Sequence, residues 1–328
     1  MKAIVCPKYG PPDVLQLKDI EKPSPNDNEV LIKIQASSLN PADLDFVRGS
    51  FYYRMKRLRK PKYLILGSDV AGRVDEIGRN VKQFQAGDEI FVDTWKYGFG
   101  AFAEYVCVPE DALRSKPASM TFEQAATLPQ AAVLALQGLR DKGRIQSGHK
   151  VLINGASGGV GTFAVQIAKS FGAEVTGVAS TKKLDMVRSI GADYVIDYTQ
   201  EDFTKSGQRY DLILDVAAHH SIFNCKRALN PKGIYALIGG SNGPIYQNIF
   251  LGPLVSLFGS KKMGIMMWKS NKKESMVSLG ELFEAGKFVP VIDRLYPLSE
   301  VAEGLRYLEE GHARGKVVIT MGQNYGQS

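Results

Sequence analysis

Hydrophobic and polar positions follow two different patterns in the two parts of the chain. Up to about residue 120, short apolar runs are separated by turn residues, and in the run 29–36 Val30, Ile32 and Ile34 recur at every second position. A period of two residues is typical of a strand with one buried face. The first part therefore predicts an all-β, barrel-like unit, with strands over 3–6, 14–17, 29–36, 67–77, 88–92 and 102–108.

From about residue 122, short apolar strands alternate with helix-like segments. Helices are expected over 122–126, 131–139, 162–171, 182–190, 273–285 and 301–308. Further strands are expected over 151–154, 175–179, 194–196, 212–216, 234–238, 264–268 and 317–320. This alternation predicts βαβ units with a parallel sheet. The apolar segment 245–258 is interpreted as a loop, which either walls a substrate pocket or belongs to the core or a dimer surface.

The fold class is therefore predicted as α/β with two domains. Residues 1–122 form a β-rich domain that residues 269–328 complete, and residues 123–268 form a doubly wound dinucleotide-binding domain. A length of 328 residues fits two domains, and 44% hydrophobic and 23% charged residues are ordinary for a globular chain.

The cysteines and the apolar runs bear on the compartment. Cys6, Cys107 and Cys225 lie far apart and form no CxxC pair, so a disulfide scaffold is not expected and a reducing compartment fits best. The longest apolar run, 249–258, has ten residues, whereas a transmembrane helix needs about 20. The N-terminal segment becomes polar too early for a secretory signal. We expect a soluble, cytoplasmic protein.

The formal net charge is +7, and much of the excess lies in one run from Arg54 to Lys62. The run contains Arg54, Lys56, Arg57, Arg59, Lys60 and Lys62. It is interpreted either as a solvated loop or as a weak contact with an anionic membrane surface. The chain contains no nucleic-acid recognition motif, so no nucleic-acid partner is expected.

The strongest functional signal is a glycine-rich turn between the strand 151–154 and the following helix. Gly155, Gly158 and Gly161 follow the spacing GxxGxxG, which suits a sharp turn, close approach of a pyrophosphate and tight helix–strand packing. The helix N-terminus adds unpaired N–H groups and a positive dipole end. The predicted phosphate-contacting residues are Gly155, Ser157, Gly158, Gly159, Val160 and Gly161.

The next strands indicate which dinucleotide binds. The strand 175–179 ends in Ser180, Thr181, Lys182 and Lys183, whereas an NAD site carries a carboxylate there for the ribose 2′-hydroxyl. We therefore predict NADP(H), with the 2′-phosphate held by these four residues. Tyr198 is expected over the adenine end of the cofactor. The segment after the fifth strand is expected to face the nicotinamide, through Gly239, Gly240 and Ser241.

The same turn also matches the nucleophile elbow GxSxG of hydrolases. Ser157 would be the nucleophile, with Asp215 and one of His219, His220 or His312 completing the triad. We favour dinucleotide binding, because the elbow does not need Gly161 and hydrolases do not begin with a long β-rich unit.

Several motifs together resemble the medium-chain dehydrogenase/reductase superfamily over essentially the whole chain. They are Asn40-Pro-Ala-Asp43, Gly67-Ser-Asp-Val-Ala-Gly72, Gly87-Asp88, Gly100-Ala-Phe-Ala-Glu-Tyr105, the turn 155–161, Gly191-Ala-Asp193, Asp197-Tyr198 and Gly315-Lys-Val-Val318. They are most similar to the quinone oxidoreductase branch, which includes alkenal and enone reductases. The resemblance implies a GroES-like β-barrel catalytic domain, a Rossmann domain and a homodimer paired through the last strand near 264–267.

The resemblance also implies that the enzyme works without zinc. Zinc alcohol dehydrogenases of the superfamily have a Cys where Asn40 stands and a His–Glu pair where Ser68 and Asp69 stand. Catalytic zinc needs about three protein ligands, so no metal residues are predicted. Without a metal acid on the oxygen, hydride transfer suits a quinone or the C=C bond of an α,β-unsaturated carbonyl.

The catalytic residues that the resemblance implies are Asn40 and Asp43. Asn40 would donate a hydrogen bond near the nicotinamide or the substrate oxygen, and Asp43 would hold its loop. The same residues are equally typical of a simple helix start. Tyr52 and Tyr53 either line the substrate entrance or are ordinary loop aromatics.

Two residues depart from the branch and leave the substrate open. Leu134 stands where quinone reductases often have a Thr, and Asp45 stands where relatives commonly have a Tyr. The other hypotheses are a zinc-free alcohol or carbonyl dehydrogenase of the same fold and a non-catalytic NADPH-binding protein.

Overall fold

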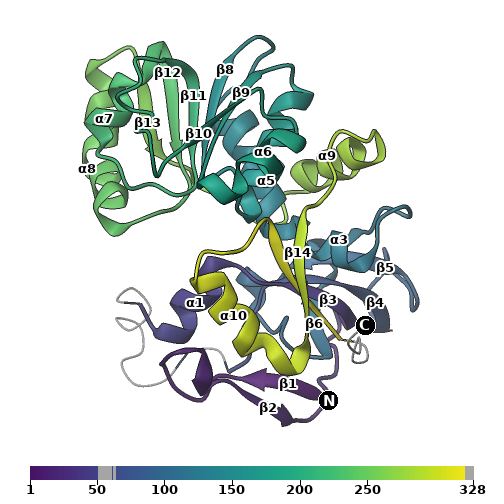
Figure 1. The fold of residues 1–328 in the computed structure, drawn as a ribbon. Coiled ribbons are helices and arrows are strands. Elements are labelled where there is room, and N and C mark those ends of the chain that lie inside the picture. Colours follow the sequence, from purple (N-terminus) through teal and green to yellow (C-terminus); the bar gives the residue numbers. More distant parts are fainter. Residues whose placement is uncertain (51–60, 62–63, 322–328) are drawn as a thin grey trace. The chain divides into compact units, whose positions relative to one another are not determined.

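The computed structural model describes residues 1–50, 61 and 64–321, and its ribbon is drawn in Figure 1. Tyr52, Tyr53 and the six cations of the run from Arg54 to Lys62 lie outside the described residues. The chain divides into two compact units. Unit 1 contains Met1–Gln130, Ser270–Gly280 and Ile292–Ser328, and unit 2 contains Ala131–Lys269 and Glu281–Val291.

Unit 1 is built mainly from antiparallel strands. Its larger sheet has the strand order β14-β15-β3-β4-β5-β7, and β6 pairs with β3 on a separate branch. The strands are β3 (Glu29–Ser38), β4 (Asp69–Ile77), β5 (Glu89–Asp93), β6 (Tyr105–Pro109), β7 (Arg114–Ser115), β14 (Ile292–Pro297) and β15 (Lys316–Thr320). A separate hairpin pairs β1 (Lys2–Val5) with β2 (Gln16–Asp19). The strand β15, from the last part of the chain, pairs directly with β3, so segments about 280 residues apart in the sequence share one sheet.

Helices and short helical turns cover this sheet. The α-helices are α1 (Pro41–Arg48), α3 (Phe122–Ala126) and α10 (Val301–Glu309). The single turns are η1 (Pro12–Val14), η2 (Trp95–Tyr97), η3 (Glu110–Ala112) and η7 (Leu298–Glu300). One apolar core lies between α1, α10 and the strands, where Phe46, Val47, Phe102, Val301 and Leu305 are buried together.

Unit 2 contains a six-stranded parallel sheet in the order β10-β9-β8-β11-β12-β13. The strands are β8 (Lys150–Asn154), β9 (Glu174–Ala179), β10 (Tyr194–Asp197), β11 (Tyr210–Asp215), β12 (Leu229–Leu237) and β13 (Lys262–Ile265). In chain order this is 3-2-1-4-5-6, the order of dinucleotide-binding folds. The predicted α/β class with a doubly wound sheet is confirmed.

The connections of unit 2 are helical. They are α4 (Val133–Leu136), α5 (Gly159–Ser170), η6 (Thr181–Lys183), α6 (Leu184–Ser189), α7 (Ile222–Arg227) and α8 (Asn242–Phe258). Wider helical turns at η4 (Leu128–Ala132) and η5 (Gln137–Lys142) flank α4, and α9 (Lys273–Glu284) runs across the boundary between the two units. Among the described residues, no helix is long and apolar enough to cross a membrane.

The segment 245–258, which the sequence suggested was a loop, is the helix α8. Pro244, Asn248 and Gly252 are its buried residues, and they recur every four residues on one face. A Cβ on Gly252 would lie 3.0 Å from the carbonyl oxygen of Met263, so glycine lets the helix approach β13. Pro253 stands inside this helix, and the Gly-Pro pair made the sequence resemble a turn.

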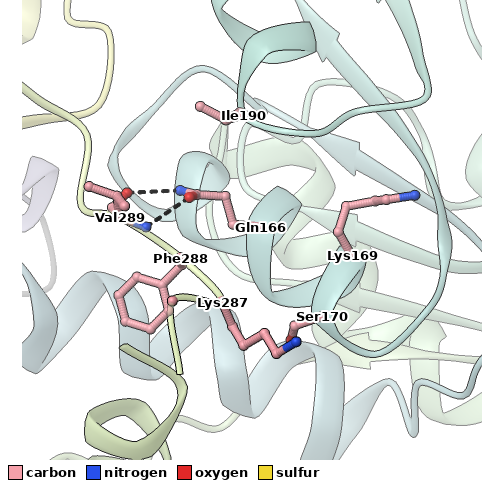
Figure 2. A pocket seen from close by; sticks show the side chains of 8 residues that line it. Gln166, Lys169, Ser170, Ile190, Lys287, Phe288 and Val289 are labelled. Carbon is pink, nitrogen blue, oxygen red and sulfur yellow. Dashed lines mark hydrogen bonds between the residues drawn. The ribbon is translucent and has the colours of Figure 1, made fainter. Parts of the chain in front are cut away.

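Residues 281–291 belong to unit 2 because of two contacts with α5. Phe288 packs edge-on against Phe163, with ring centroids 5.5 Å apart. The Gln166 side chain exchanges two hydrogen bonds with the Val289 backbone, at 2.9 and 3.0 Å (Figure 2). A cavity of about 300 Å³ lies beside them, lined by Gln166, Lys169, Ser170, Ile190, Gly286, Lys287, Phe288 and Val289. Its α5 residues come from the C-terminal half of that helix, whereas the glycine-rich turn 155–161 leads into the N-terminal end.

Candidate functional site

The predicted cofactor residues of unit 2 gather at one edge of its sheet. Gly155 follows β8, Ser180 follows β9, Tyr198 follows β10 and Gly239 lies shortly after β12. Since all these strands are parallel, their carboxyl ends meet at the same edge. From β8 the chain first adds strands on one side of the sheet and then, at β11, on the other. Ligands of open α/β sheets bind at the point where the strand order changes in this way.

Each of the three glycines of the turn is favoured at its position for a different structural reason. Gly155 has φ +83°, a left-handed conformation that favours glycine. A Cβ on Gly161 would lie 2.0 Å from the Gly155 carbonyl oxygen, so the helix could not pack as it does. A Cβ on Gly158 would have only the Gly155 oxygen nearby, at 3.6 Å, so that position faces open space.

That open space suits a phosphate group. Gly158 caps α5, which begins at Gly159, and the first N–H groups of a helix have no partner inside the helix. Gly159, Val160 and Gly161 are the first residues of α5, so their N–H groups belong to this unpartnered first turn, where the helix dipole favours an anion. The residues present fit the pyrophosphate of a dinucleotide.

A buried carboxylate fixes the strands beneath the turn. Asp215 Oδ1 accepts a hydrogen bond from Asn154 Nδ2, and Asp215 Oδ2 accepts one from the Tyr235 hydroxyl, both at 2.7 Å. These residues come from β11, β8 and β12, three neighbours in the sheet. Burial raises the pKa of Asp215, and the hydrogen bonds from Tyr235 and Asn154 oppose that rise.

The contacts of Asp215 also speak against the hydrolase alternative. The candidate histidines have other neighbours: His219 Nδ1 lies 3.1 Å from the Ala217 carbonyl oxygen, His220 Nε2 lies 3.6 Å from Asp202, and His312 lies 3.3 Å from Glu310. Asp215 is bound by Asn154 and Tyr235 instead, so the Ser–Asp–His triad is not assembled.

The edge formed by β9 and β10 holds the residues predicted to bind the 2′-phosphate. Lys182 is exposed and Ser180 is half-buried. Thr181 donates its hydroxyl hydrogen to the carboxylate of Asp197 at the end of β10. A phosphate dianion accepts hydrogen bonds, so this hydroxyl cannot also donate to one. Of the residues predicted to bind the 2′-phosphate, Lys182 and Lys183 are the cationic ones.

Asp197 is a carboxylate that the sequence interpretation did not place here. Thr199 donates to its Oδ1 from both the backbone nitrogen and the hydroxyl, at 2.9 and 2.8 Å. These bonds and that from Thr181, the largest cause, lower the pKa of Asp197. The sequence shows Asp197 in the motif Asp197-Tyr198, but its contact with Thr181 follows only from the pairing of β10 with β9. Tyr198 next to it is 55% exposed.

The segment after β12 is hydrogen-bonded to the segment after β11. The Ala218 nitrogen donates to the Gly239 oxygen at 2.9 Å, and Ser241 donates its N–H and its hydroxyl to the Ala218 oxygen at 2.8 and 3.0 Å. Gly240 has φ +144°, and a Cβ there would lie 2.3 Å from Ala218. This close pairing holds Gly239, Gly240 and Ser241 in one fixed loop at the carboxyl edge.

Asn40 and Asp43 lie in unit 1, in a buried polar cluster. Asn40 caps α1, and its N–H donates to Asp43 Oδ2 at 2.8 Å, so the helix-start interpretation is confirmed. The Asn40 side chain has further partners. Its Oδ1 accepts from Lys316 Nζ at 2.7 Å, and its Nδ2 donates to Asp69 Oδ2 at 2.9 Å.

These partners decide which way the Asn40 amide points. A lysine ammonium can only donate and a carboxylate oxygen can only accept when ionised. Lys316 therefore holds the amide oxygen, and Asp69 holds one of the two amide hydrogens. The remaining hydrogen-bonding capacity of the NH2 group is one N–H donor. Asn40 is buried, so this donor is held rigidly.

Unit 1 buries three neighbouring carboxylates, Asp43, Asp69 and Asp93, and the buried Lys316 lies 3.4 Å from one of them, Asp69. Asp69 lies opposite Asp93 in the register of β4 and β5, and Lys316 is 2% exposed. Burial is the largest cause that raises the pKa of Asp43 to about 7, with Asp69 adding to the rise. Burial also raises the pKa of Asp93 and lowers that of Lys316. For Asp43, Asp93 and Lys316 alike, burial disfavours the charged form and sets the direction of the pKa shift.

The donor set of this cluster does not fit a zinc ion. Asn40, Ser68 and Asp69 stand where the zinc alcohol dehydrogenases have their Cys and their His–Glu pair. The Asn40 oxygen already faces the Lys316 ammonium. A second cation there would be repelled by the first. In the described parts of the chain, no group of three or more His, Cys, Asp or Glu side chains is arranged to hold a metal.

Family models match both halves of the chain. Residues 26–118 match the model of the alcohol dehydrogenase GroES-like domain, which confirms the predicted GroES-like part of the fold. Residues 190–319 match the model described as zinc-binding dehydrogenase.

Individual relatives match nearly the whole chain. A mitochondrial NAD(P)H oxidoreductase of Mus musculus is 35% identical, over 98% of this chain and 89% of its own. An NADPH-dependent alkenal/one oxidoreductase of Arabidopsis thaliana, named chloroplastic, is also 35% identical, over 97% of this chain and 79% of its own. The solved quinone oxidoreductase of Coxiella burnetii superposes with a TM-score of 0.88 at 31% identity, covering 98% and 99% of the two chains.

The glycine turn yields a paired test. Gly158→Ala places a methyl group in open space, so we expect the unfolding midpoint to stay near wild type while NADPH affinity falls at least about tenfold. Gly161→Ala forces the turn apart and should lower stability by about 1–3 kcal/mol. Fluorescence titration and thermal unfolding measure the two effects. Gly243→Ala, whose Cβ meets nothing within 4 Å, is the control. Unchanged affinity in Gly158→Ala would place the phosphates elsewhere.

The Asp43 pKa predicts a pH-dependent stability. Because the pKa rises from 3.8 to about 7, the folded chain holds a proton between these values that the unfolded chain releases, and stability falls as the pH rises through this window. Urea unfolding at pH 5 and pH 8 should show the wild type losing at least about 1 kcal/mol, and Asp43→Asn should remove much of that loss. The exposed Asp19→Asn is the control. Equal pH dependence in Asp43→Asn and the wild type would contradict the assignment.

Proposed function

The chain belongs to the quinone and enone reductase branch of the medium-chain dehydrogenase/reductase family and is an NAD(P)H-dependent oxidoreductase, and we propose that it reduces quinones or the C=C bond of α,β-unsaturated carbonyls with NADPH and without zinc. The observation that carries this proposal is the open phosphate cradle at Gly158 beside the lysine pair at the edge of β9. The names of the relatives, quinone oxidoreductase and alkenal/one oxidoreductase, support the acceptor class.

Lys182 and Lys183 would select NADPH over NADH. Ammonium groups attract the 2′-phosphate, and Thr181 covers one oxygen of Asp197, the carboxylate that would repel it. Thr199 covers the other oxygen. Gly155, Ser157, Gly158, Gly159, Val160 and Gly161 would hold the pyrophosphate, Ser180 and Tyr198 the adenosine end, and Gly239, Gly240 and Ser241 the nicotinamide end.

The chemistry needs a hydrogen-bond donor on the acceptor oxygen. NADPH, when bound, supplies a hydride, and a proton from solvent completes the two-electron reduction to a hydroquinone or a saturated carbonyl. Negative charge develops on the acceptor's carbonyl oxygen as the hydride arrives. The free N–H of Asn40 is the donor that we assign to that oxygen, and Lys316 and Asp69 keep the amide turned in the donating direction. Asp43 fixes the backbone at Asn40.

We also propose a homodimer. Among the residues that the structure describes, β13 is the last strand of the unit 2 sheet and pairs with β12 alone, and such an edge presents backbone groups that can pair with another chain. Two copies of β13 would extend one sheet across the dimer. Light scattering at micromolar concentration tests this, because the expected mass is twice that of the chain and a monomer would refute it.

We also propose that the protein resides in the cytoplasm, which is a reducing compartment. Cys6, Cys107 and Cys225 are free thiols in the structure, and the reducing cytoplasm keeps thiols in that form. The relatives reported above are named mitochondrial and chloroplastic, so cell fractionation decides between the three compartments.

The lysine pair gives a test of cofactor choice. Lys182→Ala and Lys183→Ala should each raise the Kd for NADPH about tenfold or more, because each removes a charge-assisted bond to phosphate. The Kd for NADH should change little. Lys150→Ala at the opposite edge of the sheet, where Lys150 lies 3.8 Å from Glu174, is the matched control. Equal losses for both cofactors would contradict selection through the 2′-phosphate.

The reaction itself is tested by following NADPH at 340 nm with four acceptors, namely an alkenal, an enone, a quinone and a simple saturated aldehyde or ketone. Each assay is run with and without a chelator. We expect chelator-resistant NADPH loss, with the saturated carbonyl or the hydroquinone as product. Reduction of the simple carbonyl alone would favour the carbonyl dehydrogenase hypothesis. NADPH binding without turnover on any acceptor would favour the binding-protein hypothesis.

Asn40→Ala tests the donor. It should lower kcat about 100-fold and leave the Kd for NADPH unchanged. Ser38→Ala is the matched control, because Ser38 also donates to Asp69 Oδ2, at 2.5 Å, from a buried position. Both variants should lose about 1–2 kcal/mol of stability, and only Asn40→Ala should lose turnover. Similar kcat losses in both would mean that Asn40 acts through the cluster rather than on the acceptor.

A further inference from the structure

A carboxylate stands at the end of β10, one strand away from the lysine pair. β10 and β9 lie side by side (Figure 1), and Asp197, the last residue of β10, pairs in register with Ala179, the last residue of β9. Neighbouring strands lie about 4.8 Å apart, so Asp197 borders the turn Thr181–Lys183 that follows β9. NAD sites use a carboxylate at this edge to bind the ribose 2′-hydroxyl. Asp197 therefore has the chemistry of an NAD site, although it comes from the neighbouring strand.

Two threonines occupy the oxygens of this carboxylate. The Thr181 hydroxyl donates to Asp197 Oδ2, and Thr199 donates to Oδ1 from its N–H and its hydroxyl, at 2.9 and 2.8 Å. A carboxylate has about four acceptor positions, so three donors leave little capacity for a ribose hydroxyl. The negative charge remains, because hydrogen bonds to a carboxylate favour its ionised form, and the bond from Thr181 is the largest cause that lowers the pKa of Asp197.

The two threonines hold Asp197 from different sides. Thr199 is two residues further along the same loop, so its bonds form a local turn of the kind that aspartate side chains favour. Thr181 belongs to the turn after β9, and its bond joins that turn to the end of β10. The two hydroxyl oxygens lie 3.4 Å apart. Removing the Thr181 hydroxyl therefore frees Oδ2, the oxygen that faces the turn where the cofactor ribose is expected.

We propose that Asp197 is a cofactor-selecting residue of unit 2 and that Thr181 sets the direction of the selection. With its hydroxyl in place, Thr181 occupies the carboxylate oxygen that would otherwise accept a hydrogen bond from the 2′-hydroxyl of NADH. Without the hydroxyl, that oxygen becomes available to NADH and repels the 2′-phosphate of NADPH more strongly. The choice of cofactor then depends on one hydroxyl group as well as on the charges of Lys182 and Lys183. The inference rests on the proposed function, because it takes NADPH as the preferred cofactor at the carboxyl edge.

Equilibrium titration of the full chain with each cofactor tests the proposal. Thr181→Val keeps the size of the side chain and removes the hydroxyl. We expect its Kd for NADH to fall about tenfold, the value of a hydrogen bond to a charged group, and its Kd for NADPH to rise about fivefold. Thr181→Ser keeps a hydroxyl group and should bind both cofactors like the wild type.

Removing the charge of Asp197 shows whether Thr181 acts through this carboxylate. In the double variant Thr181→Val, Asp197→Asn, most of the gain for NADH should disappear, because a neutral amide accepts a weaker hydrogen bond than a carboxylate. Asp197→Asn alone should lower the Kd for NADPH about threefold, because one negative charge near the 2′-phosphate is lost. If Thr181 donated directly to the 2′-phosphate instead, Thr181→Val would weaken NADPH binding without strengthening NADH binding, and this result would overturn the proposal.

Thr204 provides the matched control. It donates to Asp202 Oδ1 from its N–H and its hydroxyl, at 2.9 and 2.7 Å, so Thr204→Val removes an equivalent bond from the connection between β10 and β11. Both Kd values should stay at the wild-type level in this variant. A change of cofactor preference in Thr204→Val equal to that in Thr181→Val would assign the effect to a general loosening of unit 2 and would overturn the proposal.

The wild type separates failure of this inference from failure of the proposed function. A wild type that prefers NADH would overturn the proposed NADPH preference and, with it, the direction of selection given to Thr181. A wild type that prefers NADPH, together with a Thr181→Val variant whose NADH affinity is unchanged, would overturn the role of Asp197 alone.

Discussion

Parallel pairing of six strands is the constraint on which the candidate cofactor site depends. Parallel strands present all their carboxyl ends at one edge, so loops that are far apart in the sequence are brought together without any direct attraction between them. The turn 155–161, the lysine pair after β9 and the loop 239–241 become neighbours in this way. The buried Asp215 then ties β8, β11 and β12 at that same edge. Because the turn glycines follow β8 directly, the geometry of the phosphate cradle depends on how firmly these strands are held.

Both units bury carboxylates, and the groups that compensate the buried charge differ between the two units. In unit 2, Asp215 is surrounded by neutral donors, the Asn154 amide and the Tyr235 hydroxyl, which satisfy a carboxylate without a counter-charge. In unit 1, Asp69 shares one oxygen among Ser38, Asn40 and Lys316, while Asp43 and Asp93 add further negative charge. Buried ionic groups are poor sources of stability but hold side chains in single orientations. The result at Asn40 is an amide held at both ends, with its oxygen on Lys316 and its nitrogen on Asp69.

The sequence predicts much of this because the relevant signals are local. Apolar strand runs, the spacing of Gly155, Gly158 and Gly161, and the absence of a carboxylate after β9 all depend on neighbours in the chain. The residues that sequence interpretation missed act across strands. Asp197 comes to Thr181 only because β10 pairs with β9, and Lys316 reaches Asn40 only because β15 pairs with β3. Neither pairing is visible before the topology is known. The helix α8 was missed for a local reason, because its Gly252-Pro253 pair is typical of a turn.

Two features of the molecule run against ordinary stability: buried charges in unit 1 and exposed aromatic residues on α8. A chain selected for folding alone would place apolar residues at the first and polar residues at the second, so both features call for a functional reason.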